Sequence, residues 1–524
     1  MRTNEFPFPS ARSLQRIRVF VLLFFIATFA QTPQAADRVL RWGADAEGGA
    51  PFAFADPENP NRVIGYEVDI VQAIANEMHR TPVFVQNAWD GLIPGLNRGN
   101  YDMIINGLEI TDDRKNEIAF SDPYYITYEQ LVVRQKTHDI TTLEDCHGRK
   151  VGTLKFTLAQ RLLEKAGGIK VLSYDDDVNP YIDLERGRLD AVLMDLPIAI
   201  YYGQPNPRLK FIGQPFGRME YGIGVRKSDP ALLTEINRAL RQIIQNGTLR
   251  IILEDWKLWN PMMASCLKVS VTPQYPPSAY ETFLKNSQRD MPLRERIERY
   301  ARFLPLLGRG AIMTLEISLL SMALAVVLGL ALALLKLYAP TPFPRLAGIY
   351  IEAIRGTPLL IQLFFIFYAL PAIGIKFTPY IAAVLGLGLN YAAYEAENYR
   401  AGILSVPRQQ MEAAFALGMG STQALRHIIL PQAMRLVIPP ITNDFISLLK
   451  DSSLVSVITM VELTKVYGQI ASTYYDYFGT GLIVAAIYFL LGLPFVRLAR
   501  YAEKKLARER RVTVRAPERQ APSS

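Results

Sequence analysis

The side chains that could do chemistry in this chain suit the binding of a charged small molecule better than the breaking of bonds. A zwitterionic ligand needs a cation for its carboxylate, an anion for its ammonium group and an apolar or aromatic surface beside them. Arg114 is the strongest candidate, because a guanidinium can grip a carboxylate through two parallel hydrogen bonds. A solvated arginine at the start of a helix is the alternative. The four histidines are scattered, and no Ser/His/Asp grouping or Cys/His cluster has catalytic or metal-binding spacing.

A second polar stretch, from Glu412 to Pro431, lies between two very apolar segments. Its first part predicts a short helix with a small apolar face, formed by Ala413, Ala414, Phe415 and Leu417. Gly418 is expected to end that helix, since glycine readily takes the left-handed backbone that closes a helix. Such a face suits docking against another protein, and an ordinary loop helix between membrane segments is the alternative.

The elements that must position Arg114 belong to a region in which strands alternate with helices. Short apolar runs predict strands at Val39–Ala44, Met103–Leu108, Val151–Leu154 and Ala191–Met194. Asp69–Met78 carries its apolar residues on one face and predicts a helix. This alternation predicts parallel sheets covered by helices. Residues 37–265 are therefore expected to form a soluble α/β domain, within a chain of 524 residues that is too long for one core.

The first 36 residues, 1–36, have the three parts of a secretory signal peptide. Basic residues come first, then the apolar run Val19–Ala30, then small residues. An uncleaved anchor is the alternative, and in both cases the chain from Asp37 onward is expected to be exported. Export would place the only two cysteines, Cys146 and Cys266, in an oxidising compartment, so they form either a disulfide or two free thiols.

The second half, residues 305–500, is expected to be an all-α membrane domain. Five apolar segments roughly meet the ~17–25 residues that a spanning helix needs, about 311–335, 357–375, 379–394, 436–461 and 481–499. A proline-bearing linker with a charged amphipathic helix, residues 266–304, joins the halves. The odd number of spans places the tail, 501–524, on the side opposite the exported domain. The tail is polar and is expected to be disordered from residue 506.

The net charge of +8 at pH 7 indicates membrane orientation rather than a nucleic-acid partner. Much of the excess lies in residues 497–515, directly after the last apolar run, and no basic patch with interleaved aromatic residues occurs. Basic residues gather in the expected cytoplasmic segments, whereas the external ones hold little beyond Lys376 and Lys465.

Several phrases over residues 38–260 resemble the periplasmic binding proteins for polar amino acids. They are Gly65-Tyr66-Glu67-Val68-Asp69, Trp89-Asp90-Gly91-Leu92-Ile93-Pro94, Ile110-Thr111-Asp112-Asp113-Arg114, Phe120-Ser121-Asp122-Pro123-Tyr124 and Arg188-Leu189-Asp190-Ala191. The resemblance implies two lobes around a cleft that closes on its ligand. Lobe one would comprise 37–128 and 227–265, and lobe two 129–226, with crossings at Tyr128–Arg134 and Gly222–Arg226.

The same resemblance implies roles for individual residues toward a free amino acid ligand. Arg114 would hold the α-carboxylate, Asp195 would accept from the ammonium group, and Trp89 would lie over the ligand. Asp195 could instead cap a helix, and Trp89 could belong to the core. The rest of the expected site is Asp45, Glu109, Gly107, Thr157 and Phe52.

Some positions depart from that family's pattern. Glu109 stands where Ser or Thr is common, Gly49 stands where many members have an aromatic residue, and Phe156-Thr157-Leu158 replaces a Gly-Thr-Thr-like phrase. The backbone amide of Glu109 and the hydroxyl of Thr157 could still serve the carboxylate. With Asp45, the extra acid favours a cationic ligand (arginine, lysine, ornithine or histidine, with glutamine next). Glu109 could instead pair internally with a basic neighbour.

The second half resembles the permeases of histidine/glutamine-type ABC importers over residues 305–500. Matching phrases are Arg355-Gly356-Thr357-Pro358-Leu359, Tyr394-Glu395-Ala396-Glu397-Asn398-Tyr399-Arg400 and Lys450-Asp451-Ser452-Ser453-Leu454. The stretch from Glu412 is similar to the EAA loop through which such permeases dock on a cytoplasmic ATPase. The resemblance implies ATPase contacts for Arg408, Glu412, Ala413, Ala414, Gly418 and Pro431.

No Gly-x-x-x-x-Gly-Lys-[Ser/Thr] motif occurs, so the chain is expected to be a transporter subunit without an ATPase or cofactor of its own. A separate ATPase dimer would use the ATP, and a permease homodimer is the simplest assembly, with a heterodimer as the alternative. We therefore expect an amino acid importer of the bacterial inner membrane, with a periplasmic binding domain and a cytoplasmic EAA-like loop. The alternative function is a ligand-gated ion channel with a glutamate-receptor-like clamshell, but those channels insert the pore between the lobes.

Overall fold

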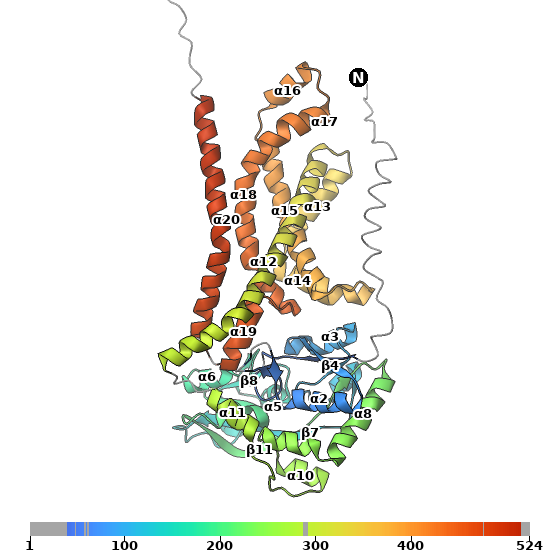
Figure 1. Cartoon of the computed structure of the whole chain (residues 1–524), viewed down its shortest axis with the longest axis vertical. Helices are drawn as coiled ribbons and strands as arrows, with labels where there is room; N and C mark the ends of the chain where they lie inside the picture. The colour runs from blue at the N-terminus through green and yellow to red at the C-terminus, as the bar shows by residue number, and fades with distance from the viewer. Residues whose placement is uncertain are drawn as a thin grey trace, which may run out of the picture.

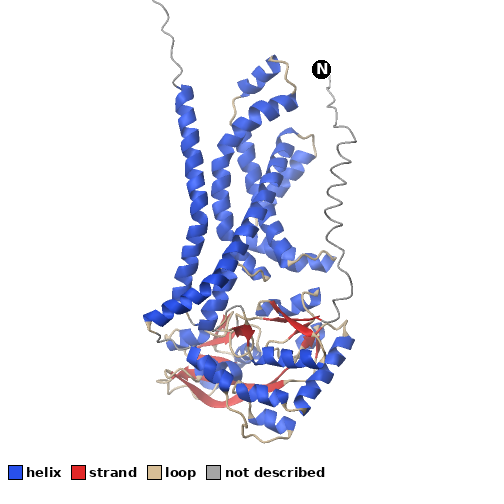
Figure 2. Cartoon of the chain, in the orientation of Figure 1, coloured by secondary structure: helices blue, strands red, loops and turns tan. Residues whose placement is uncertain are grey.

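The computed structural model describes residues 39–47, 49–56, 59, 62–286, 292–474 and 476–514. Strands occur at one end of the molecule, in an α/β domain, and a long helical region stands on that domain (Figures 1 and 2). The expected signal peptide, 1–36, lies outside the described residues. The two-part fold class expected from the sequence is confirmed, with a two-lobed α/β domain followed by helices.

The first lobe is built on a mixed five-stranded sheet in the order β4-β1-β5-β12-β6. Its strands are β1 (Val39–Ala44), β4 (Thr81–Gln86), β5 (Met103–Ile104), β6 (Ala119–Phe120) and β12 (Gly224–Val225). β1 pairs in parallel with β4 and β5, whereas β12 is antiparallel to β5 and β6. A small ribbon, β2 (Phe54–Ala55) with β3 (Val63–Ile64), lies apart from this sheet. α2 (Tyr66–Glu77) and α3 (Leu92–Arg98) pack on the sheet, and α8 (Pro230–Gln245) and α9 (Thr248–Asp255) pack on α2.

The second lobe has another five-stranded sheet, in the order β11-β7-β10-β8-β9. Its strands are β7 (Tyr125–Arg134), β8 (Lys150–Leu154), β9 (Lys170–Tyr174), β10 (Ala191–Asp195) and β11 (Leu209–Tyr221). β8 pairs in parallel with β9 and β10, and β7 is antiparallel to β10 and β11. The helices that pack on it are α5 (Leu158–Ala166) and α6 (Asn179–Glu185). Both sheets are therefore mixed: the expected parallel pairing is confined to β4-β1-β5 in the first sheet and to β10-β8-β9 in the second.

The chain crosses between the lobes earlier than the sequence indicated. β7 already pairs in the second sheet from Tyr125, so the crossing expected at Tyr128–Arg134 is wrong, and the segment after β6 makes it. β12 pairs in the first sheet, so residues 224 and 225 belong to lobe one rather than to 129–226. The physical reason is that β7 is one unbroken strand of ten residues, buried along nearly its whole length, which pairs with β11 from Tyr125 to Arg134.

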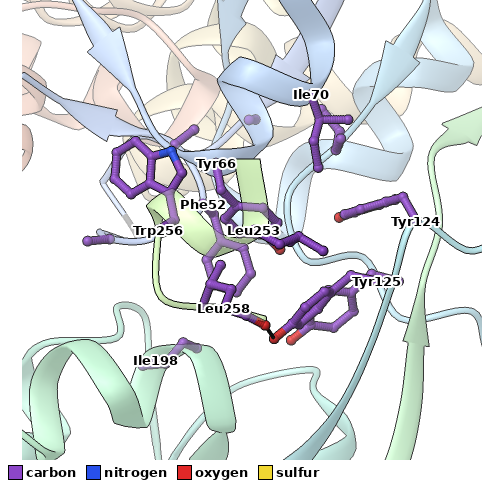
Figure 3. Packing of buried hydrophobic residues seen from close by; sticks show 14 of the residues in the cluster. Phe52, Tyr66, Ile70, Tyr124, Tyr125, Ile198, Leu253, Trp256 and Leu258 are labelled. Carbon is purple, nitrogen blue, oxygen red and sulfur yellow. Dashed lines mark hydrogen bonds between the residues drawn. The ribbon is translucent and has the colours of Figure 1, made fainter. Parts of the chain in front are cut away.

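Aromatic residues form the core beside the crossings (Figure 3). Phe52, Tyr66, Tyr125 and Trp256 are each at most 5% exposed. The hydroxyl of Tyr125 donates to the backbone oxygen of Leu258 at 2.8 Å, so the polar tip of a buried ring is satisfied. Burial of side chains this large supplies much of the apolar driving force for the domain.

The expected linker contains helices, and only its last part is continuous with the first apolar segment. α10 (Pro261–Leu267) and α11 (Ser278–Asn286) lie against the α/β domain, where Phe283 packs edge-on against Phe54 at 5.9 Å. The amphipathic helix expected at the end of 266–304 is continuous with the first apolar segment. Together they form α12 (Leu293–Tyr338), with Pro305 inside the helix.

After α12, the described helices of the helical region are α13 (Phe343–Arg355), α14 (Leu359–Phe364), η5 (Phe365–Ala369), η6 (Leu370–Ile373), α15 (Pro379–Leu404), α16 (Arg408–Ala416), α17 (Ser421–Ala424), η7 (Leu425–Ile429), α18 (Leu430–Asp451), η8 (Ser452–Ile458), α19 (Leu463–Tyr474) and α20 (Tyr477–Val514). By length and composition, two described helices can cross a membrane, in Arg294–Tyr338 and Tyr477–Tyr501. Two consecutive helical segments, Phe343–Arg355 and Leu359–Ile373, are bent by 107° relative to each other. Counted together as one span, they raise the number of candidate spans to three. The number of five spans expected from the sequence is therefore approximate. α15 and α18 have spanning length but carry charged residues.

α20 continues into the expected tail. The helix extends to Val514, so the expectation of disorder from residue 506 is wrong up to that point. Residues 501–514 are rich in Ala, Leu, Glu, Lys and Arg, which are strong helix formers even where the sequence is polar.

Candidate functional site

A cavity between the two lobes holds most of the residues expected to bind the ligand. Its lining is Asp45, Phe52, Trp89, Asn106, Gly107, Glu109, Leu154, Thr157, Asp175, Asp177, Asp195 and Ile198. The cavity measures only about 30 Å³, which is small beside the ~300–1,000 Å³ of typical ligand pockets. The lobes are therefore closed on each other.

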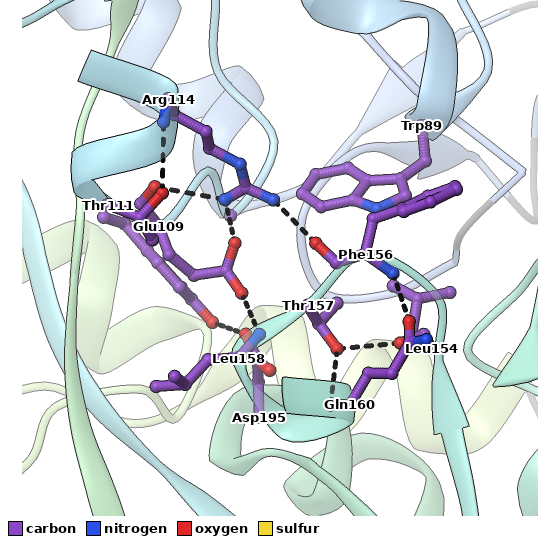
Figure 4. Close-up of polar contacts among 12 residues, drawn as sticks. Trp89, Glu109, Thr111, Arg114, Leu154, Phe156, Thr157, Leu158, Gln160 and Asp195 are labelled. Carbon is purple, nitrogen blue, oxygen red and sulfur yellow. Dashed lines mark hydrogen bonds and ion pairs between the residues drawn. The ribbon is translucent and has the colours of Figure 1, made fainter. Parts of the chain in front are cut away.

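Arg114 lies at the cleft with its guanidinium already engaged (Figure 4). Thr111 begins α4 (Asp112–Glu117) as its cap and accepts from the backbone amide of Arg114. The guanidinium forms an ion pair with the carboxylate of Glu109 and donates to the backbone oxygens of Glu109, at 3.1 Å, and Phe156, at 2.9 Å. The expected carboxylate-binding group is present, but a carboxylate of the chain itself occupies it.

Glu109 bridges the two lobes. One oxygen pairs with Arg114, and Oε1 accepts from the backbone amide of Leu158, at the start of α5 in lobe two, at 2.9 Å. The Glu109 side chain is only 2% exposed. Of the two roles considered from the sequence, the structure shows the internal pairing with a basic neighbour.

Asp195 ends β10 in lobe two and faces the cleft. It accepts a hydrogen bond from the hydroxyl of Tyr221, and it is paired in the sheet with Glu129 of β7. Burial raises the pKa of Asp195 to about 7, and the negative charge of Glu109 adds to this effect. A ligand ammonium group would offset both causes, so Asp195 is suited to the role expected for it.

The side chain of Asp45 is hydrogen-bonded to the backbone of Trp89. One carboxylate oxygen of Asp45 accepts from the amide of Trp89 at 2.8 Å, and the other accepts from the side chain of Gln86 at 2.9 Å. Asp45 thus orients its own loop as well as lining the cleft. The indole of Trp89 donates to the backbone oxygen of Lys155 in lobe two at 3.1 Å, and Arg114 lies over its ring.

Gly107, Phe52 and Thr157, three of the expected site residues, contact other groups of the chain itself. Gly107 donates its amide to the buried Glu67 at 2.6 Å, and its φ of +59° suits glycine. A Cβ at Gly107 would lie 2.6 Å from the ring of Phe52, so the glycine lets that ring lie under the cleft. Thr157 caps α5, and its hydroxyl donates to the backbone oxygen of Leu154 at 2.7 Å. These residues shape the cleft, and their polar groups already have partners within the chain.

Two cleft acids were missed by the sequence reasoning. Asp175 forms an ion pair with Lys155 at 2.6 Å, and Asp177 is 3% exposed. Burial and then the charge of Asp195 raise the pKa of Asp177 well above its usual value. Its Oδ1 has no hydrogen-bond partner among the described residues. The run Asp175-Asp176-Asp177, just before α6, was the feature of the sequence that could have indicated them.

A larger cavity of about 1090 Å³ lies outside the closed cleft, between the binding domain and the helical region. Arg114 and Trp89 reach it from one side, and Tyr368 and Lys465 reach it from the other. Both lobes contact the helices around it. Arg98 of lobe one donates to the backbone oxygen of Phe367 at 2.6 Å, and Asn179 of lobe two donates to Tyr477 at 3.2 Å.

The stretch from Glu412 lies at the end of the helical region far from the α/β domain (Figure 1). α16 begins at Arg408, Gly418 has a φ of +79° just after it, and Pro431 stands in the first turn of α18. The expected apolar face is divided, because Ala414 is buried whereas Leu417 is 82% exposed. Arg408, Glu412, Ala413, Phe415, Gly418 and Pro431 are also exposed.

Cys146 is buried and Cys266 is exposed, and both are free thiols. The disulfide considered from the sequence is therefore wrong. Cys146 packs in the core of lobe two, whereas Cys266 lies in α10 after lobe one.

Comparison with known proteins identifies both halves of the chain. Residues 40–258 match the bacterial extracellular solute-binding proteins, family 3, and residues 325–508 match the binding-protein-dependent transport system inner membrane component. The L-cystine transport system permease protein TcyB of Bacillus subtilis is 41% identical over 196 residues, which are 36% of this chain and 84% of that protein. The ABC transporter arginine-binding protein 1 of Escherichia coli is 29% identical over 246 residues, 46% of this chain and 99% of that protein. A solved structure of an ancestral arginine-binding protein bound to arginine shares 35% identity and covers 42% of this chain and 98% of its own, with a TM-score of 0.40.

Proposed function

Because the chain belongs to the amino acid ABC importers, as a family 3 solute-binding domain fused to an inner membrane permease domain, we propose that it imports a cationic L-amino acid. Arginine, lysine, ornithine and histidine are the candidates, and glutamine is the next choice. The permease match offers no support for the ion channel considered as the alternative. Neither matched domain is an enzyme.

The buried carboxylate of Asp177 is the observation that carries this proposal. Arg114, beside the cleft, is suited to the ligand carboxylate, and Asp195, inside it, to the ammonium group. Asp177 remains as a buried acid with an unpartnered oxygen in a lining that holds four other carboxylates. An uncompensated buried charge is strongly unfavourable, so a cationic side chain beside it would be stabilised. The arginine-binding relative supports the same ligand class, whereas the cystine permease relative leaves the substrate open.

The test is equilibrium binding to the full chain purified in lipid nanodiscs. Radiolabelled arginine is competed with lysine, ornithine, histidine, glutamine, cystine and glutamate. Asp177→Asn should weaken arginine binding about 10- to 100-fold, since hydrogen bonds to charged groups contribute about 1.5–3 kcal/mol, and should change glutamine binding much less. Asp139→Asn is the matched control, because Asp139 is an exposed acid of the same lobe. Tight binding of cystine or glutamate with no binding of arginine would contradict the cationic class.

The wider assembly is also part of the proposal. A cytoplasmic ATPase dimer would dock on α16 and α17, and two copies of this chain would form the permease. The binding domain would then be periplasmic and the C-terminal end of α20 cytoplasmic. Support comes from the placement of the α/β domain and α16 at opposite ends of the helical region (Figure 1). Cysteine accessibility in intact cells and native mass spectrometry of the purified complex test the orientation and the copy number.

A further inference from the structure

The carboxylate of Glu109 is bound by two groups that would suit the carboxylate of an amino acid ligand. The donors suited to that group are the guanidinium of Arg114 in lobe one and the backbone amide of Leu158 at the start of α5 in lobe two. A helix N-terminus and an arginine are both strong anion-binding groups. Each is already paired with one oxygen of the Glu109 carboxylate.

We propose that Glu109 is a built-in competitor of the ligand, a carboxylate that closes the unloaded cleft and must leave Arg114 before an α-amino acid can bind. The inference rests on the proposed function only in that the cleft takes an α-amino acid, and it does not depend on the ligand's side chain.

The closure around Glu109 is supported by further contacts to the same segment of lobe two. Arg114 donates to the backbone oxygen of Phe156 at 2.9 Å, and Trp89 donates to that of Lys155 at 3.1 Å. Lys155 also forms an ion pair with Asp90 of lobe one at 3.1 Å. All of these join lobe one to residues 155–158, and Glu109 lies at their centre. The cavity of about 30 Å³ left behind them is small beside the ~300–1,000 Å³ of typical ligand pockets.

A competitor of this kind affects affinity in a predictable way. Ligand binds only to the fraction of molecules in which Glu109 has left its donors, so the apparent affinity is reduced by that fraction. The effect acts on ligands that need Arg114 for a carboxylate. A ligand that lacks the carboxylate can leave Glu109 on Arg114, so it meets less competition.

The test compares L-arginine with agmatine, which is arginine without its carboxylate, on the full chain in nanodiscs. In Glu109→Thr, the dissociation constant of L-arginine should fall at least about tenfold, and the ratio of the agmatine to the L-arginine constant should rise by a similar factor. Glu109→Gln keeps the shape and removes the charge, so it should act in the same direction if the threonine variant folds poorly. Asp113→Asn is the control, because it removes one exposed acid from α4 outside the cleft lining.

A second readout follows the lobes directly. Fluorophores on the two lobes should report a more open unloaded cleft in Glu109→Thr than in the unmodified chain. An unchanged or falling agmatine-to-arginine ratio, or weaker arginine binding in both Glu109 variants, would overturn the proposal. Should the chain bind glutamine or cystine instead of arginine, the pairs glutamine with 4-aminobutanamide or cystine with cystamine apply the same test. The proposed preference for a cationic ligand and the proposed competition by Glu109 can therefore be disproved separately.

Discussion

Lys465 of the permease domain places its ammonium nitrogen 2.7 Å from a carboxylate oxygen of Glu47 in the binding domain. The two residues are 418 positions apart, and both side chains are largely enclosed, with 6% and 22% of their surface exposed. Glu47 follows the first strand of lobe one, and Lys465 stands in the first turn of α19. This ion pair joins the tethered domain to the permease domain beside the cavity that both halves line.

Reversing one charge of the pair should impair transport, and reversing both should restore it in part. Glu47→Lys and Lys465→Glu each leave two like charges in contact, which we expect to lower arginine uptake into proteoliposomes at pH 8 several-fold. The double variant rebuilds the attraction in the opposite sense. Lys170→Glu, on an exposed strand of lobe two, is the control for a simple change of net charge. Double-variant uptake no better than that of the worse single variant would exclude a direct pairing.

The docking of the binding domain should weaken as the pH rises toward about 7 and should change little above that value. Burial raises the pKa of Glu47 from its usual 4.5 to about 7, even though Lys465 acts in the opposite direction. A carboxyl with a raised pKa in the docked state favours docking at low pH, and that contribution is lost as the pH rises through about 7. The charged groups facing Glu47 are Lys465, Asp45 and Glu462.

Hydrogen exchange of α19, measured between pH 5.5 and 8.5 after correction for the intrinsic exchange rate, follows this docking. Protection should fall with rising pH in the unmodified chain and stay nearly level in Glu47→Gln. An equal slope in both proteins would assign the pH dependence to another group.

The exposed tip of the loop after α16 should be needed for ATPase coupling but not for folding. Leu417 is 82% exposed, so Leu417→Asp removes little buried surface and should leave the melting temperature nearly unchanged. If the loop docks on an ATPase, the same variant should abolish stimulation of ATP hydrolysis by the ligand in the reconstituted complex. Val271→Asp, at a 53% exposed position near the binding domain, is the matched control.

Thiol labelling should distinguish the two cysteines without any reductant. Burial raises the pKa of Cys146 to about 11, whereas Cys266 is exposed. Maleimide at pH 7 should therefore label the folded chain once, and Cys266→Ser should abolish that labelling. Unfolding in denaturant without reductant should expose the second thiol. A chain that takes up no label until it is reduced would show that the two cysteines are paired.

The short sequence motifs around the cleft predicted which residues lie there. Arg114, Asp195 and Trp89 all lie at the cleft because their phrases follow strands and start helices, and these local elements set where the side chains emerge. The same local reasoning placed the first crossing between the lobes too late, because a pattern a few residues long does not show which sheet the start of β7 joins. The membrane half was recognised from its apolar segments, but their division into spans also depends on bends that composition does not reveal.

The sequence by itself determined the order of the domains, the kind of protein and the residue types in the cleft, since these depend on composition and on patterns a few residues long. Only the tertiary structure decided which charges meet. Glu109 reaches Arg114 within its own lobe and Leu158 across the cleft, and Lys465 reaches Glu47 across the whole chain. Such contacts form when the lobes close and the domains dock, and they depend on side-chain distances of a few ångströms that spacing along a chain does not set.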